Sequence, residues 1–578
     1  MTRPTPAIVS ERAARPIPRP WLWGLCVTYV LAGFVGRDPW KSADMAAFGY
    51  MAELVAGTSD WWVPTLLGQA PERMSLLPYW LGALSIQALG GWLGPGLAAR
   101  LPFIGLLALA LAATWWGTYC LARLRAAQPV AFAFGGEAEP AAYATVLADG
   151  ALLALLASLG LAQLGHEATP TLARLGFGAL LYAGLASLPL RPWRGLAAAV
   201  LGLAGLALSG AEWRAVVLLL PLAALVPAAG RVKLALAAAV LGLAGVSWAL
   251  GVGSVGGVFA WGRGMDFDAW RREARLLLWF TWPAWPLALI TVARWRRQWR
   301  AWHVLLPLYW TVLVTSLALL SATSDRILLL ALPALATLAA FALPTLERGV
   351  SAFIDWFTLL FFTGWGIVIW VVWIAMQTGF PPQPAANVAR LAPGFVPSWS
   401  IPAFVVAVAA TGAWLALARW RTGRHREALW KSLVLPAAGA TLCWTLFMSL
   451  WLPLLDFARS YGPLVRQVAK IIEVPGGCTA VDGMSRAQIA ALRYYGGLDL
   501  RAGTGAACPW LLVDASALQG HPLAAPGHGW ARVATVRRPS DNDEDLVVFR
   551  RDAAATIAPV AVEPGIQVEP TQKGRAAP

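Results

Sequence analysis

The feature that most constrains this chain is a series of apolar runs of about 18 residues or more, separated by short loops rich in arginine. An apolar helix of about 20 residues crosses the hydrocarbon core of a bilayer, and cytoplasmic loops are enriched in Lys and Arg. Hydrophobic residues make up 58% of the 578 residues and charged residues only 13%. The sequence therefore predicts an all-α polytopic membrane domain.

We predict about thirteen transmembrane helices, because this number places every arginine-rich loop on the cytoplasmic side. The first covers residues 20–36. Residues 43–57 and 76–93 are short of a span and have mixed polarity, which is typical of helices in the membrane interface. The net charge of +15 lies largely in the inner loops, so no nucleic-acid partner is expected. The other predicted spans are 99–122, 142–164, 172–189, 195–209, 213–230, 233–252, 277–293, 302–321, 326–345, 352–376, 402–418 and 431–453.

The chain divides into four predicted regions. Residues 1–19 are rich in Arg and Pro and are predicted to be a disordered cytoplasmic N-terminus. Residues 20–455 form the membrane domain, whose first external loop is 37–98. Residues 456–555 mix helical and β-rich patterns, including a hairpin of ARVATV and DLVVFRR, and predict a small external α/β domain. Residues 556–578 are predicted to be a disordered tail.

Two of the five cysteines, Cys478 and Cys508, lie in the predicted external domain. In an oxidising compartment they predict a disulfide, and the alternative is a pair of unbonded buried thiols. The sequence contains no CxxC, no HExxH and no GxxxxGK[ST] motif. A structural zinc site and ATP-driven transport are therefore not expected.

The stretch 36–80 is far more polar than the apolar runs on either side of it. It carries five acids among tryptophans and amphipathic segments. Charged groups placed against a membrane are energetically unfavourable and are often functional. The acids are Asp38, Asp44, Glu53, Asp60 and Glu72. The simplest interpretation of Glu53 and Asp60 is that they are solvated loop residues.

Within this stretch, SADMAAFGYMAELVAGTSDWWVPTLLGQAPERMSLLPYW resembles the first external loop of the GT-C membrane glycosyltransferases. It is most similar to the group of the lipid A aminoarabinose transferase and the protein O-mannosyltransferases. Their loop reads D-E-x-R-Y-A-E, then a Trp-containing turn, then E-K-P-P-L-x-Y-W. Asp44 matches the leading acid, and Glu72 and Arg73 stand for the Glu-Lys pair, one residue further from the final Trp. The remaining matches are Trp61, Pro64, Pro78, Tyr79 and Trp80.

The chain also departs from the family pattern. Met45 replaces the second acid, Ala47 the arginine and Phe48 the tyrosine, and Leu330 stands where a later stretch has a tyrosine. These differences weaken an assignment of the aminoarabinose donor and leave the general chemistry in place.

The resemblance implies transfer of a sugar from a polyprenyl (undecaprenyl) phosphate to lipid A, another glycan or a protein, at the periplasmic face of a bacterial inner membrane. Asp44 would be the catalytic carboxylate, which takes the proton of the acceptor hydroxyl. The phosphate leaving group needs cations. Arg73, Arg214 and Arg326 are the candidates, and Tyr79 is assigned to the same donor site. The alternatives are an N-cap for Asp44 and interfacial snorkelling for the arginines.

Two further assignments stay open in the sequence. A divalent metal held by Glu72 and Asp38 is one interpretation, because hard cations prefer oxygen ligands. The other is a solvated Glu72 and a local pairing of Asp38 with Arg37 or Lys41. No other cofactor is expected. Asp149 resembles a family acid that reaches the external site, yet the charge-based topology puts it near the cytoplasmic half of a span; a broken segment at 128–148 would reconcile the two.

Two functions compete with glycosyl transfer. A lipid or solute transporter predicts charges at mid-membrane depth and an internal repeat, and the sequence shows no repeat. A non-catalytic envelope assembly protein of the same fold is favoured by Met45, which removes one acid of the family pair.

Overall fold

The computed structural model describes residues 5–251, 267–321, 324–422, 428–472, 477–503, 508–518, 530–538, 544–551 and 566–567. The chain forms two compact units. The helical unit contains residues 1–36, 72–369 and 401–450. The sheet unit contains residues 37–71, 370–400 and 451–578. The predicted tail at 556–578 lies almost wholly outside the described residues.

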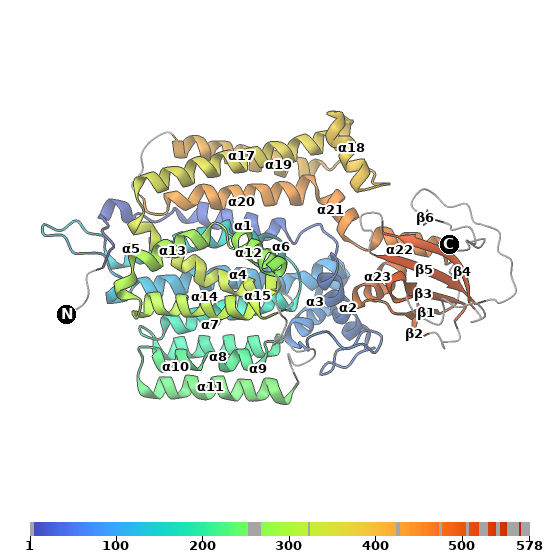
Figure 1. The fold of residues 1–578 in the computed structure, drawn as a ribbon, viewed down its shortest axis with the longest axis horizontal. Helices are drawn as coiled ribbons and strands as arrows, with labels where there is room; N and C mark the ends of the chain where they lie inside the picture. The colour runs from blue at the N-terminus through green and yellow to red at the C-terminus, as the bar shows by residue number, and fades with distance from the viewer. Residues whose placement is uncertain are drawn as a thin grey trace. The chain divides into compact units, whose positions relative to one another are not determined.

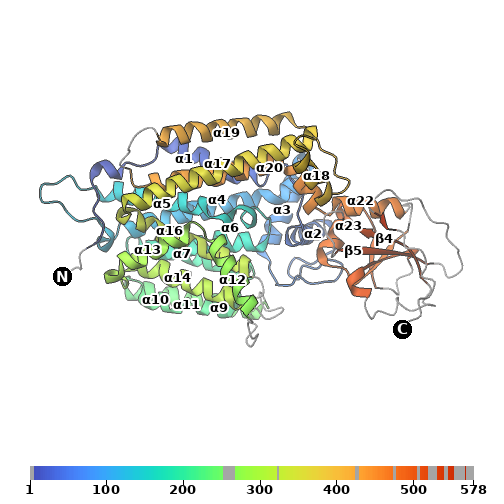
Figure 2. The same cartoon turned by 45° about the horizontal axis from the view of Figure 1, so that its top comes forward.

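The helical unit is a bundle of long apolar helices that run side by side (Figures 1 and 2). Most of α17 (Arg348–Thr378) also belongs to it. The other helices are α1 (Arg19–Ala32), α3 (Leu77–Leu93), α4 (Pro95–Ala122), α5 (Pro140–Ala157), α6 (Leu159–Leu164), α7 (Pro170–Ser187), α8 (Pro192–Leu208), α9 (Trp213–Val217), α10 (Leu220–Leu225), α11 (Gly230–Ala249), α12 (Phe267–Phe280), α13 (Ala284–Arg294), α14 (Trp302–Leu319), α15 (Ser324–Leu328), α16 (Leu332–Ala342), α19 (Ile401–Thr422) and α20 (Lys431–Leu450).

Among the described residues, eight helices are long and apolar enough to cross a membrane, or nine if α12 and α13, bent by 87°, form one span. The predicted number of thirteen is therefore not confirmed, although a multi-pass helical domain is. Helices α1 and α8 are only 14 and 17 residues long. The predicted span 213–230 is divided between the two short helices α9 and α10.

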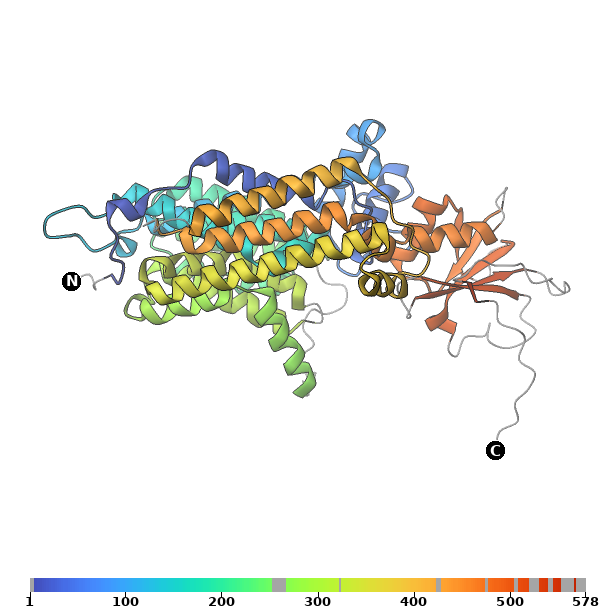
Figure 3. The ribbon, with the colours of Figure 1, turned by 90° about the horizontal axis from the view of Figure 1, so that it is seen from above.

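Two helix pairs show how the bundle is packed. Helices α7 and α8 approach closely through small residues: a Cβ on Gly202 would lie 2.5 Å from the Leu181 nitrogen. Small residues allow apolar helices to come this close without a hydrophobic driving force. Helices α19 and α20 lie side by side (Figure 3), where the rings of Trp420 and Trp430 stack at 6.2 Å.

The described part of the N-terminal segment differs from the disorder expected for residues 1–19. Residues 11–14 form a 3₁₀ turn. The carbonyls of this proline-rich segment accept hydrogen bonds from the rest of the helical unit. The Ala7 carbonyl accepts from Val130 N–H at 2.9 Å, and the Arg15 carbonyl accepts from Trp430 Nε1 at 2.8 Å.

The sheet unit contains the predicted α/β domain, with strand order β2-β1-β3-β5-β4-β6. Strand β1 pairs in parallel with β2 and β3, and β5 pairs antiparallel with β3 and β4, so the predicted hairpin is present. The sequence prediction missed β2. The strands are β1 (Thr479–Asp482), β2 (Leu500–Ala502), β3 (Trp510–Asp514), β4 (Ala531–Arg537), β5 (Asp545–Arg550) and β6 (Ile566–Gln567), and the helices are α2 (Ala43–Ala56), α18 (Pro382–Leu391), α21 (Leu452–Arg459), α22 (Gly462–Ile471) and α23 (Arg486–Gly496).

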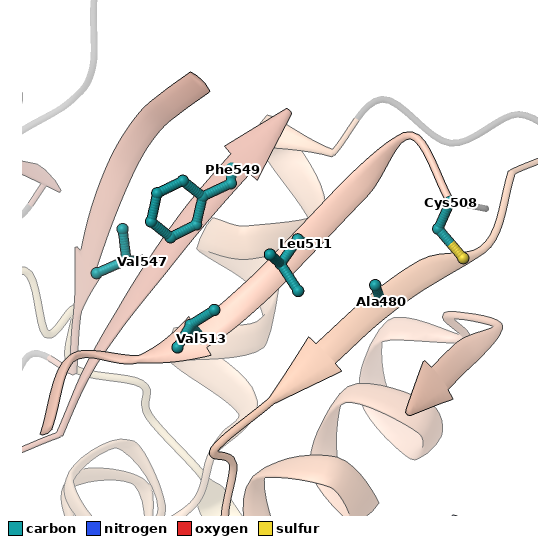
Figure 4. Packing of buried hydrophobic residues seen from close by; sticks show 6 residues of the cluster. All are labelled: Ala480, Cys508, Leu511, Val513, Val547 and Phe549. Atoms are coloured by element: carbon teal, nitrogen blue, oxygen red, sulfur yellow. The ribbon is translucent and has the colours of Figure 1, made fainter. Parts of the chain in front are cut away.

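One face of the sheet buries a small apolar core (Figure 4). The structure pairs Cys478 with Cys508 at the edge of this core, with their Cα atoms 5.1 Å apart. The remaining core side chains alternate along three strands, as a half-buried sheet requires. They are Ala480, Leu511, Val513, Val547 and Phe549.

Replacing both Cys478 and Cys508 with Ser is expected to destabilise the sheet unit by about 3–4 kcal/mol. The disulfide joins two residues that are 30 positions apart in the sequence, and this loop lowers the conformational entropy of the unfolded chain. Urea-dependent proteolysis of the purified full-length protein measures this effect. A Cys120→Ser variant, at a buried free cysteine of the helical unit, is the matched control. Equal proteolysis midpoints for the double variant and wild type would contradict the stabilising role.

The first-loop helix α2 belongs to the same unit as the C-terminal domain, which the sequence analysis treated separately. It packs on α23: a Cβ on Gly49 would lie 2.5 Å from the Ala490 Cβ, and the Phe48 and Tyr494 rings meet edge-on at 4.6 Å. Glu53 forms an ion pair with Arg493 and is 7% exposed. The interpretation of Glu53 as a solvated loop acid is therefore wrong.

Candidate functional site

The predicted site residues fall into two groups, one in each unit. Asp38 and Asp44 belong to the sheet unit. The helical unit contains the others, which are Glu72, Arg73, Tyr79, Asp149, Arg214 and Arg326. Each group is described within its own unit.

Asp44 lies in the first turn of α2 and is fixed by two donors from the preceding loop. Its Oδ2 accepts a hydrogen bond from the Trp40 backbone N–H at 3.1 Å and an ion pair from Arg37 at 2.9 Å. Both charged side chains are 2% exposed. The N-cap position belongs to Ser42, so Asp44 does not cap the helix. The arrangement is a buried, oriented carboxylate paired with a guanidinium.

A second carboxylate, Asp456 on α21, holds the loop that orients Asp44. The Trp40 indole Nε1 donates to Asp456 Oδ1 at 2.7 Å, and the Asp38 N–H donates to the same oxygen at 3.3 Å. The guanidinium of Arg37 lies 4.6 Å from the Trp40 ring centroid, and that of Arg459 lies 5.3 Å from it. Trp40 thus links Asp456 to the site of Asp44 through its side chain and its backbone.

Sequence reasoning missed Asp456, because it follows the last apolar run and was assigned only to the start of the external domain. The usable signal was an acid placed directly after a span, the same signal that singled out the first loop. The expected pairing of Asp38 with Arg37 or Lys41 is not formed among the described residues; Asp38 contacts Asp456 instead.

Burial, and secondarily the negative charge of Asp38, raises the pKa of Asp456 from 3.8 to about 7, against the lowering effect of Trp40 and Arg37. Between these two values the folded protein binds more protons than the unfolded chain, so stability falls as pH rises from about 4 to about 7. The melting temperature of wild type relative to that of Asp456→Asn should therefore be higher at pH 5 than at pH 8. Parallel pH profiles for the two proteins would contradict this assignment.

In the helical unit, three arginines from separate segments lie close enough to interact electrostatically with one another. Arg73 lies in the loop before α3, Arg326 in α15 and Arg174 in α7. Burial and the positive charge of Arg326 lower the pKa of Arg73, while Glu72 and Glu212 raise it. Arg174 interacts electrostatically with both Arg73 and Arg326. We call these three residues the arginine cluster; mutually repelling cations held together in this way favour an anion.

The neighbourhood of the arginine cluster contains both polar and charged side chains. The Arg73 Nη2 donates to the Ser321 hydroxyl at 3.5 Å. Tyr79 is 4% exposed and interacts electrostatically with Arg174. The structure therefore brings together three of the predicted donor residues and adds Arg174. The missed signal was an arginine inside the predicted span 172–189, since ionisable residues in spans are rare and often functional.

Arg214 has a different environment. It forms an ion pair with Glu212 at 2.8 Å, its side chain is 58% exposed, and its guanidinium lies 5.1 Å from the Trp213 ring centroid. A role for Arg214 in donor binding stays a prediction.

Asp149 is fully buried in α5, and its partners come from the N-terminal segment and α4. Its Oδ1 accepts from Arg19 at 2.9 Å and from Trp115 Nε1 at 2.8 Å, and its Oδ2 accepts from the Ile17 N–H at 3.1 Å. The loop before α5 is also tied to this segment, since the Ala138 N–H donates to the Val9 carbonyl. The hydrogen bonds of Asp149 in the described part of the chain therefore go to the N-terminal segment and to α4, and a role for Asp149 at the external site stays a prediction.

The two proposed metal ligands, Asp38 and Glu72, belong to different units. In the part of the chain that the structure describes, no three His, Cys, Asp or Glu side chains converge as a metal would require. A divalent metal stays a prediction.

The fold is shared with solved glycosyltransferase structures. The chain is 16% identical to ArnT from Cupriavidus metallidurans in the apo state, with a TM-score of 0.59, over 93% of this chain and 98% of that chain. The structure of the same protein bound to undecaprenyl phosphate gives 15% identity and a TM-score of 0.55 over the same shares. No family model and no curated protein matches the sequence. The predicted resemblance to the GT-C group is thus confirmed at the level of the fold.

Proposed function

We propose that this protein is a glycosyltransferase of the bacterial inner membrane that takes its sugar from a polyprenyl phosphate. The arginine cluster is the observation that carries the proposal, because a lipid phosphate leaving group needs fixed cations. The fold shared with ArnT, of which one structure contains undecaprenyl phosphate, supports the same class of donor. The acceptor is an envelope lipid, glycan or protein, and the site faces the periplasm.

In this proposal the two groups of residues have separate roles. Asp44 takes the proton of the acceptor hydroxyl, whose oxygen attacks the anomeric carbon of the sugar. The bond from that carbon to the phosphate oxygen breaks, and undecaprenyl phosphate leaves with the bonding electrons. Arg73, Arg174 and Arg326 stabilise the negative charge that grows on this phosphate. Arg37 and Trp40 fix the direction of the Asp44 carboxylate.

A non-catalytic assembly protein of the same fold remains the second candidate, and two observations favour it. Asp44 is buried in an ion pair, and the fully buried Met45 stands where the family pattern has a second acid. Both candidates bind a polyprenyl phosphate, and only the enzyme turns over a lipid-linked sugar.

Binding of undecaprenyl phosphate tests the feature that both candidates share. Native mass spectrometry of the detergent-purified protein should detect one retained undecaprenyl phosphate. Farnesyl phosphate, which carries the same headgroup on a shorter chain, should bind more weakly because it buries less apolar surface. Absence of retained undecaprenyl phosphate in wild type would contradict both candidates.

A further inference from the structure

A groove of about 350 Å³ lies within the sheet unit, and Asp44 is not among its lining residues. It is formed by the chain that precedes α19, by α21 and α22, and by the loop after α1. Its wall carries two carboxylates, a guanidinium and apolar rings. The residues that matter here are Asp38, Phe395, Pro453, Asp456, Phe457 and Arg466.

The groove is lined by acidic and basic side chains that form no ion pair with one another in the described part of the chain. Among the described residues, neither the Asp38 carboxylate nor the exposed Arg466 guanidinium forms an ion pair. Both hydrogen bonds to Asp456 arrive at Oδ1 and come from uncharged N–H groups. Asp38 and Arg466 therefore face one small space without an ion pair in the described part of the chain. Asp456 adds a second acidic group, and an ammonium bound beside it would favour its ionised form.

The groove also has an apolar side that adjoins two candidate spans in the sequence. The rings of Phe395 and Phe457 lie 5.5 Å apart. Val396, which is 80% exposed, precedes the start of α19 at Ile401, and Pro453 follows the end of α20 at Leu450. Both helices are long and apolar enough to span a bilayer, and Val396 and Pro453 lie only a few residues from their ends in the sequence. A chain that leaves a span passes through the headgroup region.

We propose that this groove binds the headgroup of a zwitterionic phospholipid bearing a primary ammonium, of the phosphoethanolamine type. The ammonium contacts Asp38 and Asp456, the phosphate contacts Arg466, and the acyl chains begin along Phe395 and Phe457. This site is separate from the arginine cluster, which belongs to the other unit. A result that overturns this lipid site would leave the proposed transferase activity unaffected.

The charge pattern selects this headgroup against the other common ones. A phosphatidylglycerol offers a phosphate to Arg466 but nothing positive to the two carboxylates. A quaternary ammonium, as in phosphatidylcholine, has the charge but no N–H to donate, whereas a primary ammonium donates three hydrogen bonds. Each charge-assisted hydrogen bond contributes about 1.5–3 kcal/mol, which corresponds to about a tenfold or greater preference.

The test is lipid retention by the full-length protein, measured by native mass spectrometry after equilibration in nanodiscs of equal parts phosphatidylethanolamine, phosphatidylglycerol and phosphatidylcholine with identical acyl chains. Wild type should retain phosphatidylethanolamine about tenfold over the other two. Asp38→Asn should reduce this preference to near unity, because it removes a partner of the ammonium. Arg466→Gln should lower the retention of all three lipids, because all three carry the phosphate. Asp499→Asn and Arg501→Gln, at an exposed ion pair on the same unit, are the matched controls and should keep the wild-type preference.

Two results would overturn the proposal. One is equal retention of the three lipids by wild type, and the other is a preference for phosphatidylethanolamine that survives Asp38→Asn. Soluble glycerophosphoethanolamine, added as a competitor, shows whether the ligand is a membrane lipid or a soluble molecule with the same headgroup. Displacement of the lipid only at millimolar competitor supports a membrane lipid as the ligand, because the acyl chains then contribute to binding; displacement at equimolar competitor overturns the assignment to a lipid.

Discussion

Replacing Asp44 with Asn is expected to lower the turnover of the transfer reaction by about 10²- to 10⁴-fold and to leave the binding of undecaprenyl phosphate unchanged. The amide has nearly the shape of the carboxylate but cannot take a proton from the acceptor hydroxyl. The loss should therefore appear in kcat and not in the affinity for the donor. Release of undecaprenyl phosphate from a radiolabelled lipid-linked sugar measures it.

The matched control for this variant is Glu53→Gln, because it breaks another ion pair on the same helix, in which the glutamate is largely buried and the arginine is partly exposed. Removing one partner of a buried pair destabilises a protein by about 3–5 kcal/mol, so both variants are expected to unfold more easily. Only Asp44→Asn should lose turnover when activity is expressed per folded molecule. Equal losses in the two variants would assign Asp44 a structural role.

Replacing Arg174 with Gln is expected to lower kcat/KM for the lipid-linked donor by about 10²-fold, because one of three cations facing the phosphate is lost. Within its own helix Arg174 donates to the Pro170 carbonyl at 3.3 Å and to the Thr171 hydroxyl at 3.2 Å. A glutamine retains part of this local hydrogen bonding and removes the charge.

Arg294→Gln provides the control for Arg174→Gln, since Arg294 is an exposed arginine of the helical unit that pairs with Glu347. Exposed ion pairs contribute only about 0–1 kcal/mol, so this variant should behave as wild type. Donor binding that weakens equally in both variants would indicate a general effect of charge, and would remove the arginine cluster from the donor site.

The membrane fold could be predicted from the sequence to a large extent. Apolar length and arginine-rich loops located nearly every helix, because a bilayer fixes how long an apolar helix must be. The number of spans could not be predicted, because residues 213–225 form two short helices and α12 and α13 meet at a sharp bend. Hydropathy adds up apolar residues and does not register where a helix breaks.

The candidate site could be predicted only where its residues share one stretch of sequence. Asp44, Arg73 and Tyr79 lie in the predicted first external loop, at positions that align with the family pattern. Arg174 and Asp456 lie far from it in the chain, and each is a single charge within or after an apolar run. Their roles depend on contacts across long sequence separations, such as the hydrogen bond from Trp40 to Asp456, and no local pattern encodes those contacts.

The most direct test of the central claim is turnover by the purified protein reconstituted with a lipid extract of its native membranes. The account predicts that wild type converts lipid-linked sugar to free undecaprenyl phosphate and a glycosylated acceptor, and that Asp44→Asn does not. Retention of undecaprenyl phosphate by wild type with no sugar released from any lipid-linked donor in the extract would contradict it.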